Sequence, residues 1–429
     1  MIADQSALTI NHQIIDDQQF HPKLTIFAGK MPPPTSSSGP PIRIILLASV
    51  LKPLDDTRMY GKFARTLLAR PDTTVHVAGR YAPPPPTPAN LHLHSLLQGT
   101  RLSWARLGAQ HRYWQLLQRL RPDLVVVHAP ELLPLTILWQ RLGGNRRFLY
   151  DIRENYALNV ATQRVYGGFT RRWLAAGLRW VETRAARCST GLLLAEESYA
   201  QELPFLDAVP ADRVVLLENK YQPALNEAPA AQPRPLPAAH EPLRLLYSGT
   251  VSELNGIQLA LQLAEELHRR RPGGVLLTVI GFCQQPVLLQ TLRRLEQTNP
   301  AWLRLVVHGA TPVAHSAIVA EIQRSHVGLL LYQPHPSSER CRPTKLFEYL
   351  AHGLPMLIPA NPLWETCIRR HEAGIVVDLH AIPEAATALL KATELPASSQ
   401  PVFYLNGIPE EAFWASESTK LRRLVDSIE

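Results

Sequence analysis

The feature that most constrains the fold is an alternation of short apolar runs with helix-like segments, which occurs twice along the 429-residue chain. Runs such as IRIILLAS at 42–49 and VLLTVI at 275–280 are apolar at nearly every position. This pattern is typical of parallel strands buried on both faces. Because the strands alternate with helices, we expect an α/β protein with two Rossmann-like parallel-sheet lobes that face a cleft.

The individual elements follow from the same pattern. In the first half we expect strands at 42–49, 75–78, 123–128, 148–151, 191–195 and 214–217. In the second half we expect them at 243–247, 275–280, 303–308, 327–331, 356–359 and 375–377. The periodic segments between them predict helices at 59–69, 113–120, 132–142, 171–187, 257–268, 287–296, 317–324 and 344–352.

Two segments rich in proline set the domain boundaries. The stretch 222–242 is rich in Pro and Ala and has no apolar period, which predicts an interdomain linker between lobes at 42–221 and 243–400. Residues 1–41 end in a run of Pro and Ser, so we expect an unfolded or appended segment, with Met31 as an alternative start. Residues 401–429 form a C-terminal segment of their own.

Composition excludes several classes of protein. The four cysteines lie far apart without a CxxC motif, and the histidines have no metal-ligand spacing, so we expect neither a disulfide scaffold nor a metal site. No apolar run is long enough for a transmembrane helix, so a cytoplasmic protein is the default expectation. The net charge of +8 suits phosphates, nucleotides or anionic lipid, but the basic residues are dispersed, which argues against nucleic acid.

The motif with the most chemistry is a short helix between Pro343 and Gly353, two residues typical of a helix start and of the position after a helix end. Thr344 and Lys345 lie in its first turn, where free N–H groups and the helix dipole attract an anion such as a diphosphate. Glu348 lies about 4.5 Å further along the axis, and a carboxylate accepts hydrogen bonds from two vicinal ribose hydroxyls. A surface helix with a Lys–Glu pair explains the spacing equally well.

The string RPTKLFEYLAHGLPMLIP, which contains this helix, resembles the nucleotide-sugar motif of family-4 glycosyltransferases with the GT-B fold. Further segments resemble the same family in the same order, and the likeness covers about residues 42–429. These segments are 216–219, 246–250 with Asn255 and Gly256, 278–281, 307–309, 374–378 and the terminal helix at 411–428, which packs back on the first lobe in that family.

The resemblance implies a donor site in the second lobe. Lys345 would bind the diphosphate and assist catalysis, Glu348 would bind the ribose, and the donor site would also include Gly249, Thr250, Gly281, Pro343 and Thr344. Thr250 and Asn255 stand where many members carry basic residues, and Arg340 stands where many carry a glutamate. Glu339 is one residue off that register, and Arg340 or Arg342 is a candidate for the missing positive charge.

In the first lobe, polar residues follow strands at the edge that faces the cleft. Asp56 and Arg58 are candidates for acceptor contact, with helix capping by Asp56 as the alternative. His128 is a candidate for catalytic proton handling, with a hydrogen-bonded core histidine as the alternative. Arg153, where related sequences often carry histidine, and Glu154 are further acceptor candidates; a solvated loop carboxylate is the alternative for Glu154.

The segment 169–187 carries arginines and two tryptophans around an apolar stripe that includes Leu174, Leu178, Val181 and Ala185. It predicts either a helix that lies on an anionic membrane or an ordinary helix whose stripe faces the core.

The resemblance implies a glycosyltransferase, of a kind found in polysaccharide biosynthesis, that moves a sugar from a nucleotide-diphosphate sugar to an acceptor hydroxyl, with retention at the anomeric carbon. The acceptor would be a glycan or a lipid-linked glycan, and no cofactor would be needed beyond the donor. The location would be cytoplasmic, with possible peripheral contact with the inner face of a membrane. A GT-B nucleotide-sugar epimerase and a catalytically weakened nucleotide-sugar-binding protein remain open as alternatives.

Overall fold

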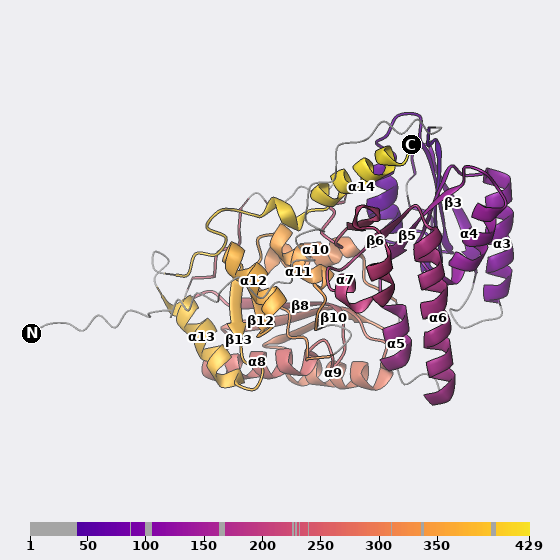
Figure 1. Ribbon diagram of the computed structural model, residues 1–429. Helices are drawn as coiled ribbons and strands as arrows, with labels where there is room; N and C mark the ends of the chain where they lie inside the picture. Colours follow the sequence, from indigo (N-terminus) through magenta and orange to yellow (C-terminus); the bar gives the residue numbers. More distant parts are fainter. Residues whose placement is uncertain are drawn as a thin grey trace, which may run out of the picture.

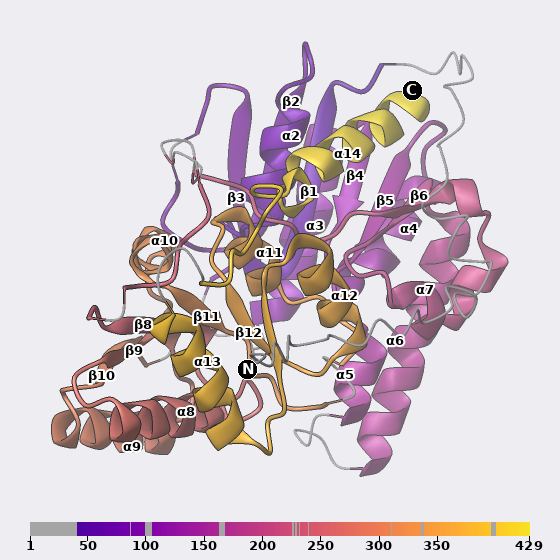
Figure 2. The same ribbon diagram turned by 90° about the vertical axis from the view of Figure 1, so that its left-hand side faces the viewer.

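The computed structural model describes residues 41–85, 87–98, 105–162, 168–224, 227, 230, 232–238, 240–309, 311–335, 339–395 and 400–429. The predicted N-terminal segment and the alternative start at Met31 lie outside these residues. The chain forms two lobes, each built around one parallel sheet (Figures 1 and 2). The prediction of two parallel-sheet lobes is confirmed.

The first sheet has seven strands in the order β3-β2-β1-β4-β5-β6-β7. Their bounds are β1 (Ile44–Pro53), β2 (Thr74–Arg80), β3 (Leu91–Leu97), β4 (Leu124–Val127), β5 (Arg147–Ile152), β6 (Gly191–Leu194) and β7 (Val214–Leu216). Every pairing between neighbours is parallel. The helices of this lobe are α2 (Arg65–Leu67), α3 (Ala105–Leu120), α4 (Leu133–Arg141), α5 (Tyr156–Thr162), α6 (Gly168–Cys188) and α7 (Tyr199–Glu202).

The second sheet has six strands in the order β10-β9-β8-β11-β12-β13, again all parallel. Their bounds are β8 (Leu243–Thr250), β9 (Val275–Phe282), β10 (Leu303–His308), β11 (Val327–Leu329), β12 (Met356–Pro359) and β13 (Gly374–Val377). The helices are α8 (Ile257–Arg270), α9 (Pro286–Thr298), α10 (His315–Arg324), α11 (Thr344–Ala351), α12 (Pro362–His371) and α13 (Ile382–Glu394). The strand β3 and the helices α12 and α13 were not among the predicted elements.

The period of two along each strand places alternate side chains on opposite faces of the sheet, and both faces are covered. Leu46 and Ala48 of β1 belong to one apolar cluster, whereas Ile45 and Leu47 belong to the cluster on the other face. The second cluster is completed by four residues from the C-terminal end of the chain: Trp414, Leu421, Leu424 and Val425. Three of them belong to α14 (Ala415–Ser427), which lies across the first lobe in Figures 1 and 2.

The chain crosses between the lobes twice, and the two crossings lie side by side. Tyr221 forms a parallel bridge with Phe413. The Tyr221 N–H donates to the Ala412 carbonyl over 2.9 Å, and the Trp414 N–H donates to the Tyr221 carbonyl over 2.6 Å. The described residues of 222–242 contain no helix or strand. The outgoing and returning segments therefore meet at one joint.

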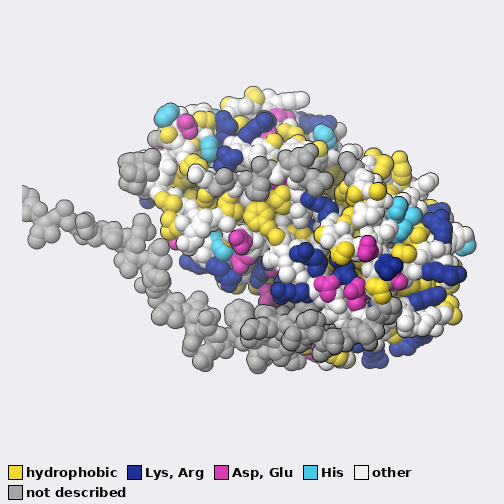
Figure 3. Space-filling model, turned by 90° about the horizontal axis from the view of Figure 1, so that it is seen from above, with side chains coloured by type: hydrophobic (Ala, Val, Ile, Leu, Met, Phe, Trp, Pro, Cys, Tyr) yellow, Lys and Arg dark blue, Asp and Glu magenta, His cyan; other side chains and the backbone are white. Residues whose placement is uncertain are grey.

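Basic side chains do not form a single patch on the face that Figure 3 shows, where Lys and Arg are interspersed with acidic and apolar side chains. In the part of the chain that the structure describes, no helix is both long enough and apolar enough to span a bilayer. Within the same residues, no group of three or more His, Cys, Asp or Glu side chains has an arrangement suited to a metal ion.

Candidate active site

Helix α11 begins at the boundary between the lobes, and its buried face fixes its orientation. Leu346, Phe347 and Leu350 are buried in the apolar cluster of the second lobe. The Tyr349 hydroxyl lies 2.8 Å from the Ser248 hydroxyl of β8, and both side chains are buried. Tyr349 therefore anchors the helix to the central strand.

Lys345 lies against the end of β8, where the backbone leaves room for it. Gly249 has a positive φ of 92°, and a Cβ atom built on it would lie 2.9 Å from the Lys345 ammonium nitrogen. Only glycine combines this backbone conformation with such close contact. The ammonium also lies 5.2 Å and 5.5 Å from the ring centroids of Tyr247 and Tyr332. Gly281, at φ 150°, packs its backbone directly against Gly249.

Asn255 stabilises the loop after Gly249, where many members of the similar family carry a basic residue. Its side-chain amide donates to the Thr250 carbonyl over 2.9 Å. The Tyr247 hydroxyl donates to the same carbonyl over 3.0 Å. The loop that follows β8 is thus held by neutral hydrogen bonds, and Lys345 is the cation in contact with it.

Glu348 lies one turn after Lys345, and its carboxylate is bound to a histidine that the sequence did not indicate. His315, the first residue of α10, has its Nε2 atom 2.6 Å from Glu348 Oε1. Glu348 is 7% exposed, whereas nearly half of the His315 side chain is exposed. The hydrogen bond with Glu348 raises the pKa of His315, although partial burial opposes the shift. Glu348 is therefore not turned to bulk solvent.

In the first lobe, Arg58, His128 and Asp151 form a buried network. Arg58 donates from Nε and Nη2 to the two Asp151 oxygens over 2.9 Å and 2.7 Å. His128 Nδ1 lies 2.7 Å from Asp151 Oδ2. All three side chains are at most 1% exposed. Burial lowers the pKa of His128. The Arg58 guanidinium and the His128 hydrogen bond together outweigh burial and lower the pKa of Asp151.

This network shows how the first-lobe candidates are placed. Arg58 is fully engaged inside the lobe, since Nη1 also donates to the Leu217 carbonyl over 2.9 Å. His128 is buried and hydrogen-bonded through Nδ1, as expected for a core histidine. Its Nε2 atom, however, has no hydrogen-bond partner among the described residues. Buried polar atoms in proteins are normally hydrogen-bonded, so a buried nitrogen without a partner is unusual. His128 therefore remains a candidate for contact with a substrate hydroxyl.

Asp56 caps the helical turn that follows β1, which was the alternative to acceptor contact in the sequence analysis. Its Oδ1 accepts from the N–H groups of Arg58 and Met59 over 3.1 Å and 2.9 Å. Arg153 also donates to both carboxylate oxygens, over 2.8 Å and 3.1 Å. Although burial opposes it, the Arg153 charge lowers the pKa of Asp56 to about 2. Asp56 and Arg153 thus form an ion pair in which both carboxylate oxygens are already bound.

Glu154 is the most accessible of the first-lobe candidates. Its side chain is 42% exposed, and Oε1 accepts from the Lys52 ammonium over 3.0 Å. It is the second residue after the end of β5 and follows Arg153. The structure therefore brings Asp56, Arg153 and Glu154 together at the carboxyl edge of the first sheet, with Glu154 open to solvent.

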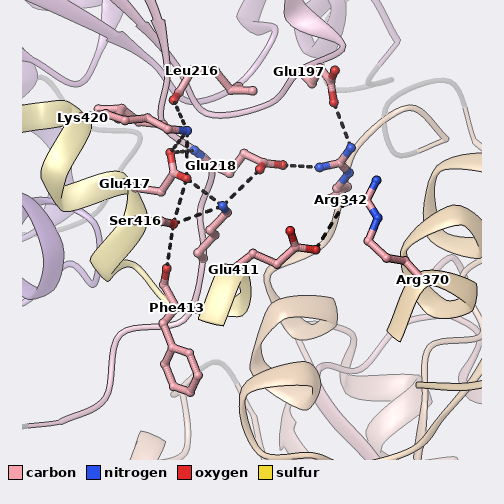
Figure 4. A network of polar contacts seen from close by, with 12 residues as sticks. Glu197, Leu216, Glu218, Arg342, Arg370, Glu411, Phe413, Ser416, Glu417 and Lys420 are labelled. Carbon is pink, nitrogen blue, oxygen red and sulfur yellow. Dashed lines mark hydrogen bonds and ion pairs between the residues drawn. The ribbon is translucent and has the colours of Figure 1, made fainter. Parts of the chain in front are cut away.

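Arg342 is not placed to supply a cation for a diphosphate, because it bridges the lobes (Figure 4). Its guanidinium donates to Glu218 over 2.8 Å and to Glu197 over 2.9 Å. Lys220 continues the network from Glu218 to Glu417 of α14. These ion pairs tie the segment before α11 to the first lobe.

Three residues beside α11 were missed by sequence reasoning: Lys62, Asn219 and His315. The Asn219 side-chain amide donates to the Thr344 hydroxyl over 3.2 Å, and its oxygen accepts from the Lys62 ammonium over 2.5 Å. Thr344 is the first residue of α11, after Pro343 at the N-cap. Lys62 and His315 carried no sequence signal, since each looked like an ordinary helix residue. Asn219 lay within a segment that resembled the family, without a predicted role.

Comparison with known proteins agrees with this geometry. Residues 58–220 match the family model described as glycosyl transferase 4-like domain. No curated protein sequence matches the chain.

Solved structures with the same fold cover both lobes. Sucrose-phosphate synthase from Thermosynechococcus elongatus is 14% identical with a TM-score of 0.59, over 90% of this chain and 99% of that chain. HepE from Anabaena, solved in complex with UDP-glucose, is 12% identical with a TM-score of 0.56, over 90% of this chain and 100% of that chain. Trehalose 6-phosphate synthase from Burkholderia multivorans is also 12% identical with a TM-score of 0.56, over 90% and 99%. The chain therefore has the two-lobed GT-B fold of these structures, and residues 58–220 are similar to the glycosyl transferase 4-like domain.

Proposed function

We propose that this protein transfers a sugar from a nucleoside-diphosphate sugar to an acceptor hydroxyl. The observation that carries the proposal is the start of α11, where Lys345 lies against Gly249 and Glu348 follows one turn later. A helix N-terminus with an adjacent ammonium suits a diphosphate, and a carboxylate at that spacing suits a ribose. The fold is shared with HepE, whose structure contains UDP-glucose.

The leaving diphosphate gains negative charge as the bond to the sugar breaks. Lys345, together with the free N–H groups of the first turn of α11, would stabilise that charge, which is electrostatic stabilisation of the transition state. These groups supply the positive charge, so the proposal requires no metal ion or other cofactor. Thr250 would add a hydroxyl or N–H donor to a phosphate oxygen.

Glu348 would exchange partners when a donor binds. Its carboxylate would release His315 and accept from the ribose hydroxyls. The acceptor would bind at the carboxyl edge of the first sheet, where Glu154 is open to solvent and His128 Nε2 lacks a partner. We further propose that transfer retains the anomeric configuration, with the leaving phosphate taking the acceptor proton.

Calorimetric binding of UDP-, GDP- and ADP-sugars tests the donor site. Lys345→Ala and Glu348→Ala should each weaken binding of the preferred donor at least about tenfold, a loss of about 1.4 kcal/mol. Lys391→Ala and Glu384→Ala, at exposed positions of α13, are matched controls and should bind as the unaltered protein does. Unchanged affinity in both α11 variants would overturn the proposal.

Turnover assays separate transfer from its alternatives. Incubation of the preferred donor with a panel of glycan and lipid-linked acceptors should give a glycosylated product. Conversion of the donor to its epimer without acceptor would identify an epimerase instead. Donor binding without turnover across the panel would identify a binding protein, which the neutral loop at Thr250 and Asn255 favours as the second candidate.

We also propose that α6 contacts an anionic membrane and so brings the enzyme to a lipid-linked acceptor. Val181 and Ala185 of α6 pack against the apolar cluster of the first lobe, whereas Leu174 of the predicted stripe is 40% exposed. A second row of large side chains faces outward. Phe169, Trp173 and Trp180 are 77%, 67% and 71% exposed, and helical spacing aligns them with the exposed Arg184 and Arg187. Tryptophan favours the bilayer interface, and each basic residue adds about 1 kcal/mol near anionic lipid.

The position of α6 suits this contact. Helices α5 and α6 pack side by side, and Figures 1 and 2 show α6 reaching beyond the neighbouring elements of the first lobe. Helix α5 begins two residues after Glu154, so the exposed stripe belongs to the same part of the lobe as the acceptor candidates. Charge complementarity selects an anionic bilayer over a neutral one.

Co-sedimentation with vesicles tests the membrane contact. The protein should bind vesicles that contain phosphatidylglycerol and not vesicles of phosphatidylcholine alone. The double variant Trp173→Ala/Trp180→Ala should lose about tenfold or more of this binding, whereas Val287→Ala, at a position 77% exposed on α9, should not. Binding that is independent of lipid charge, or self-association through the same tryptophans in sedimentation velocity, would contradict the proposal.

A further inference from the structure

Lys62 is a buried lysine at the boundary between the lobes. It is 3% exposed, and its ammonium donates to Asn219 Oδ1 over 2.5 Å. The same nitrogen lies 5.7 Å from the ring centroid of Trp414. In the part of the chain that the structure describes, no carboxylate lies within ion-pair distance of it. An amide oxygen and an aromatic ring are weak compensation for removing an ammonium from water.

The other buried cations of this region are all paired with carboxylates. Arg58 is bound by Asp151, Arg153 is bound by Asp56, and Lys220 lies 2.7 Å from Glu417. Buried charges are normally paired in this way, because an unpaired one costs several kcal/mol. Lys62 is thus an exception among its neighbours, and its burial points to an anion that this region is built to receive.

The position of Lys62 indicates where that anion would lie. Asn219, which accepts from Lys62, donates to Thr344 at the start of α11. Two hydrogen bonds therefore join the ammonium to the helix end that carries Lys345. Helices attract anions at this end, and α11 has eight residues. The ammonium of the first lobe and the helix end of the second lobe are thus separated by a single side chain, that of Asn219.

The charged groups around Lys62 do not compensate the positive charge of its ammonium form. Burial and the nearby Arg58 lower its pKa well below the usual value, and Arg153 acts in the same direction. Asp56 and Glu348 raise it, but each is already bound, to Arg153 and to His315 respectively. Binding of an anion would reverse the balance and favour the charged ammonium.

The backbone around Lys62 is also unusual. Residues Met59–Ala64 form a π-helical turn, in which the Phe63 N–H donates to the Arg58 carbonyl over 2.9 Å. π-helical turns are rare and recur at functional sites. This observation is independent of the charge argument.

We propose that the Lys62 ammonium binds the diphosphate of the nucleotide donor from the first lobe, replacing the basic residues that Thr250 and Asn255 do not provide. The inference rests on the proposed function, since it requires a nucleoside diphosphate at the start of α11. It assigns to the first lobe a binding residue that holds the donor as the lobes meet. Asn219 is the positioning residue that directs the ammonium to this site.

Calorimetry with UDP, GDP, ADP and inorganic pyrophosphate tests the inference. Lys62→Met should weaken binding of the preferred nucleotide and of pyrophosphate by about tenfold or more. Lys62→Arg, which keeps the charge, should restore part of the affinity. Lys391→Met on α13 is the matched control and should bind as the unaltered protein does. Pyrophosphate makes the result independent of which base the donor carries.

Two further measurements separate ligand binding from a structural role. Without ligand, Lys62→Met should be as stable as the unaltered protein or more so, because an apolar side chain of similar length replaces a buried polar group that has no carboxylate partner. Because the pKa of Lys62 is lowered in the free protein, nucleotide binding should take up a proton, measured in buffers of different ionisation enthalpy, and Lys62→Met should lose this uptake.

The outcomes distinguish this inference from the proposed function. If Lys345→Ala and Glu348→Ala weaken nucleotide binding but Lys62→Met does not, the proposed function stands and the role of Lys62 is overturned. If the unaltered protein binds neither nucleotide nor pyrophosphate, both are overturned. If Lys62→Met loses binding of inorganic phosphate alone, the residue serves a phosphorylated acceptor instead, which also contradicts the inference.

Discussion

Single side chains at the interlobe boundary are held by partners distant in the sequence. Glu348 is bound to His315, Lys62 to Asn219, and Arg58 to Asp151. Each contact fixes one polar group in an orientation that solvent alone would not maintain. In the proposed function, donor binding would exchange these hydrogen-bond partners, so it would depend on how tightly the present partners hold.

His315 makes that exchange dependent on pH. Its pKa is raised by Glu348, so the stability that the pair contributes is present below the usual histidine pKa and is lost as pH rises through the raised value. Glu227 also raises this pKa and Lys62 lowers it. Glu348 is released more easily once His315 is neutral, so donor affinity should rise with pH across that range.

His315→Gln removes this effect while keeping a hydrogen-bond donor. Calorimetric titration of the preferred nucleotide at several pH values should show that the variant lacks the rise seen in the unaltered protein. His380→Gln, near the start of α13, is the histidine control. An equal rise in His315→Gln would show that Glu348 does not exchange partners.

Among the structural elements, the end of β8 carries the strictest geometric requirement. Gly249→Ala would place a Cβ atom 2.5 Å from Lys345 Cε, at a φ of 92°. The left-handed conformation costs a non-glycine residue about 1–2 kcal/mol, and the displaced Lys345 would lose contact with the donor. We expect both lower stability in urea denaturation and donor affinity reduced by about tenfold.

Gly273→Ala provides the control for backbone strain. Gly273 has a φ of 73°, and a Cβ atom there would meet nothing within 4 Å. It should lose a similar amount of stability without any change in donor affinity. Equal affinities in the two variants would show that Lys345 is not held by the glycine.

At this scale the sequence predicted most of the fold, and the misses have physical causes. Continuous apolar runs identified the central strands, because a strand buried on both faces has no polar position. β3 was missed because His92 and His94 interrupt its pattern at the edge of the sheet. Helix α11 was predicted because Pro343 marks its start and Gly353 follows its end.

The site was predicted in part. Lys345, Glu348 and Gly249 are brought together as the resemblance implied, because they belong to one helix and the strand beside it. His315 and Lys62 were missed, because neither local spacing nor polarity indicates which residue of another element will approach across 33 or more positions. Arg342 was one of two candidates for the missing positive charge, but it pairs with carboxylates of the other lobe.

For the molecule as a whole, ion pairs between the lobes set their relative position. Arg342→Gln removes the bonds to Glu218 and Glu197, and Glu218 is buried. We expect a loss of about 1–3 kcal/mol in the free energy of unfolding and a larger radius of gyration in solution scattering.

Arg370→Gln is the matched control for that change. Arg370 lies 3.6 Å from Glu411, and both side chains are largely exposed (Figure 4). Exposed pairs contribute at most about 1 kcal/mol, so this variant should resemble the unaltered protein in both measurements. Equal effects of the two variants would show that the Arg342 bridge does not hold the lobes.

The parallel bridge between Tyr221 and Phe413 has a mechanical consequence. Two peptide segments bound to each other at one place act as a single pivot, and neither sheet needs to deform when one lobe turns about it. Rotation then changes the distance between α11 and the edge of the first sheet that carries Glu154. In the proposed function, a pivot of this kind would let substrates enter and products leave through the same rotation.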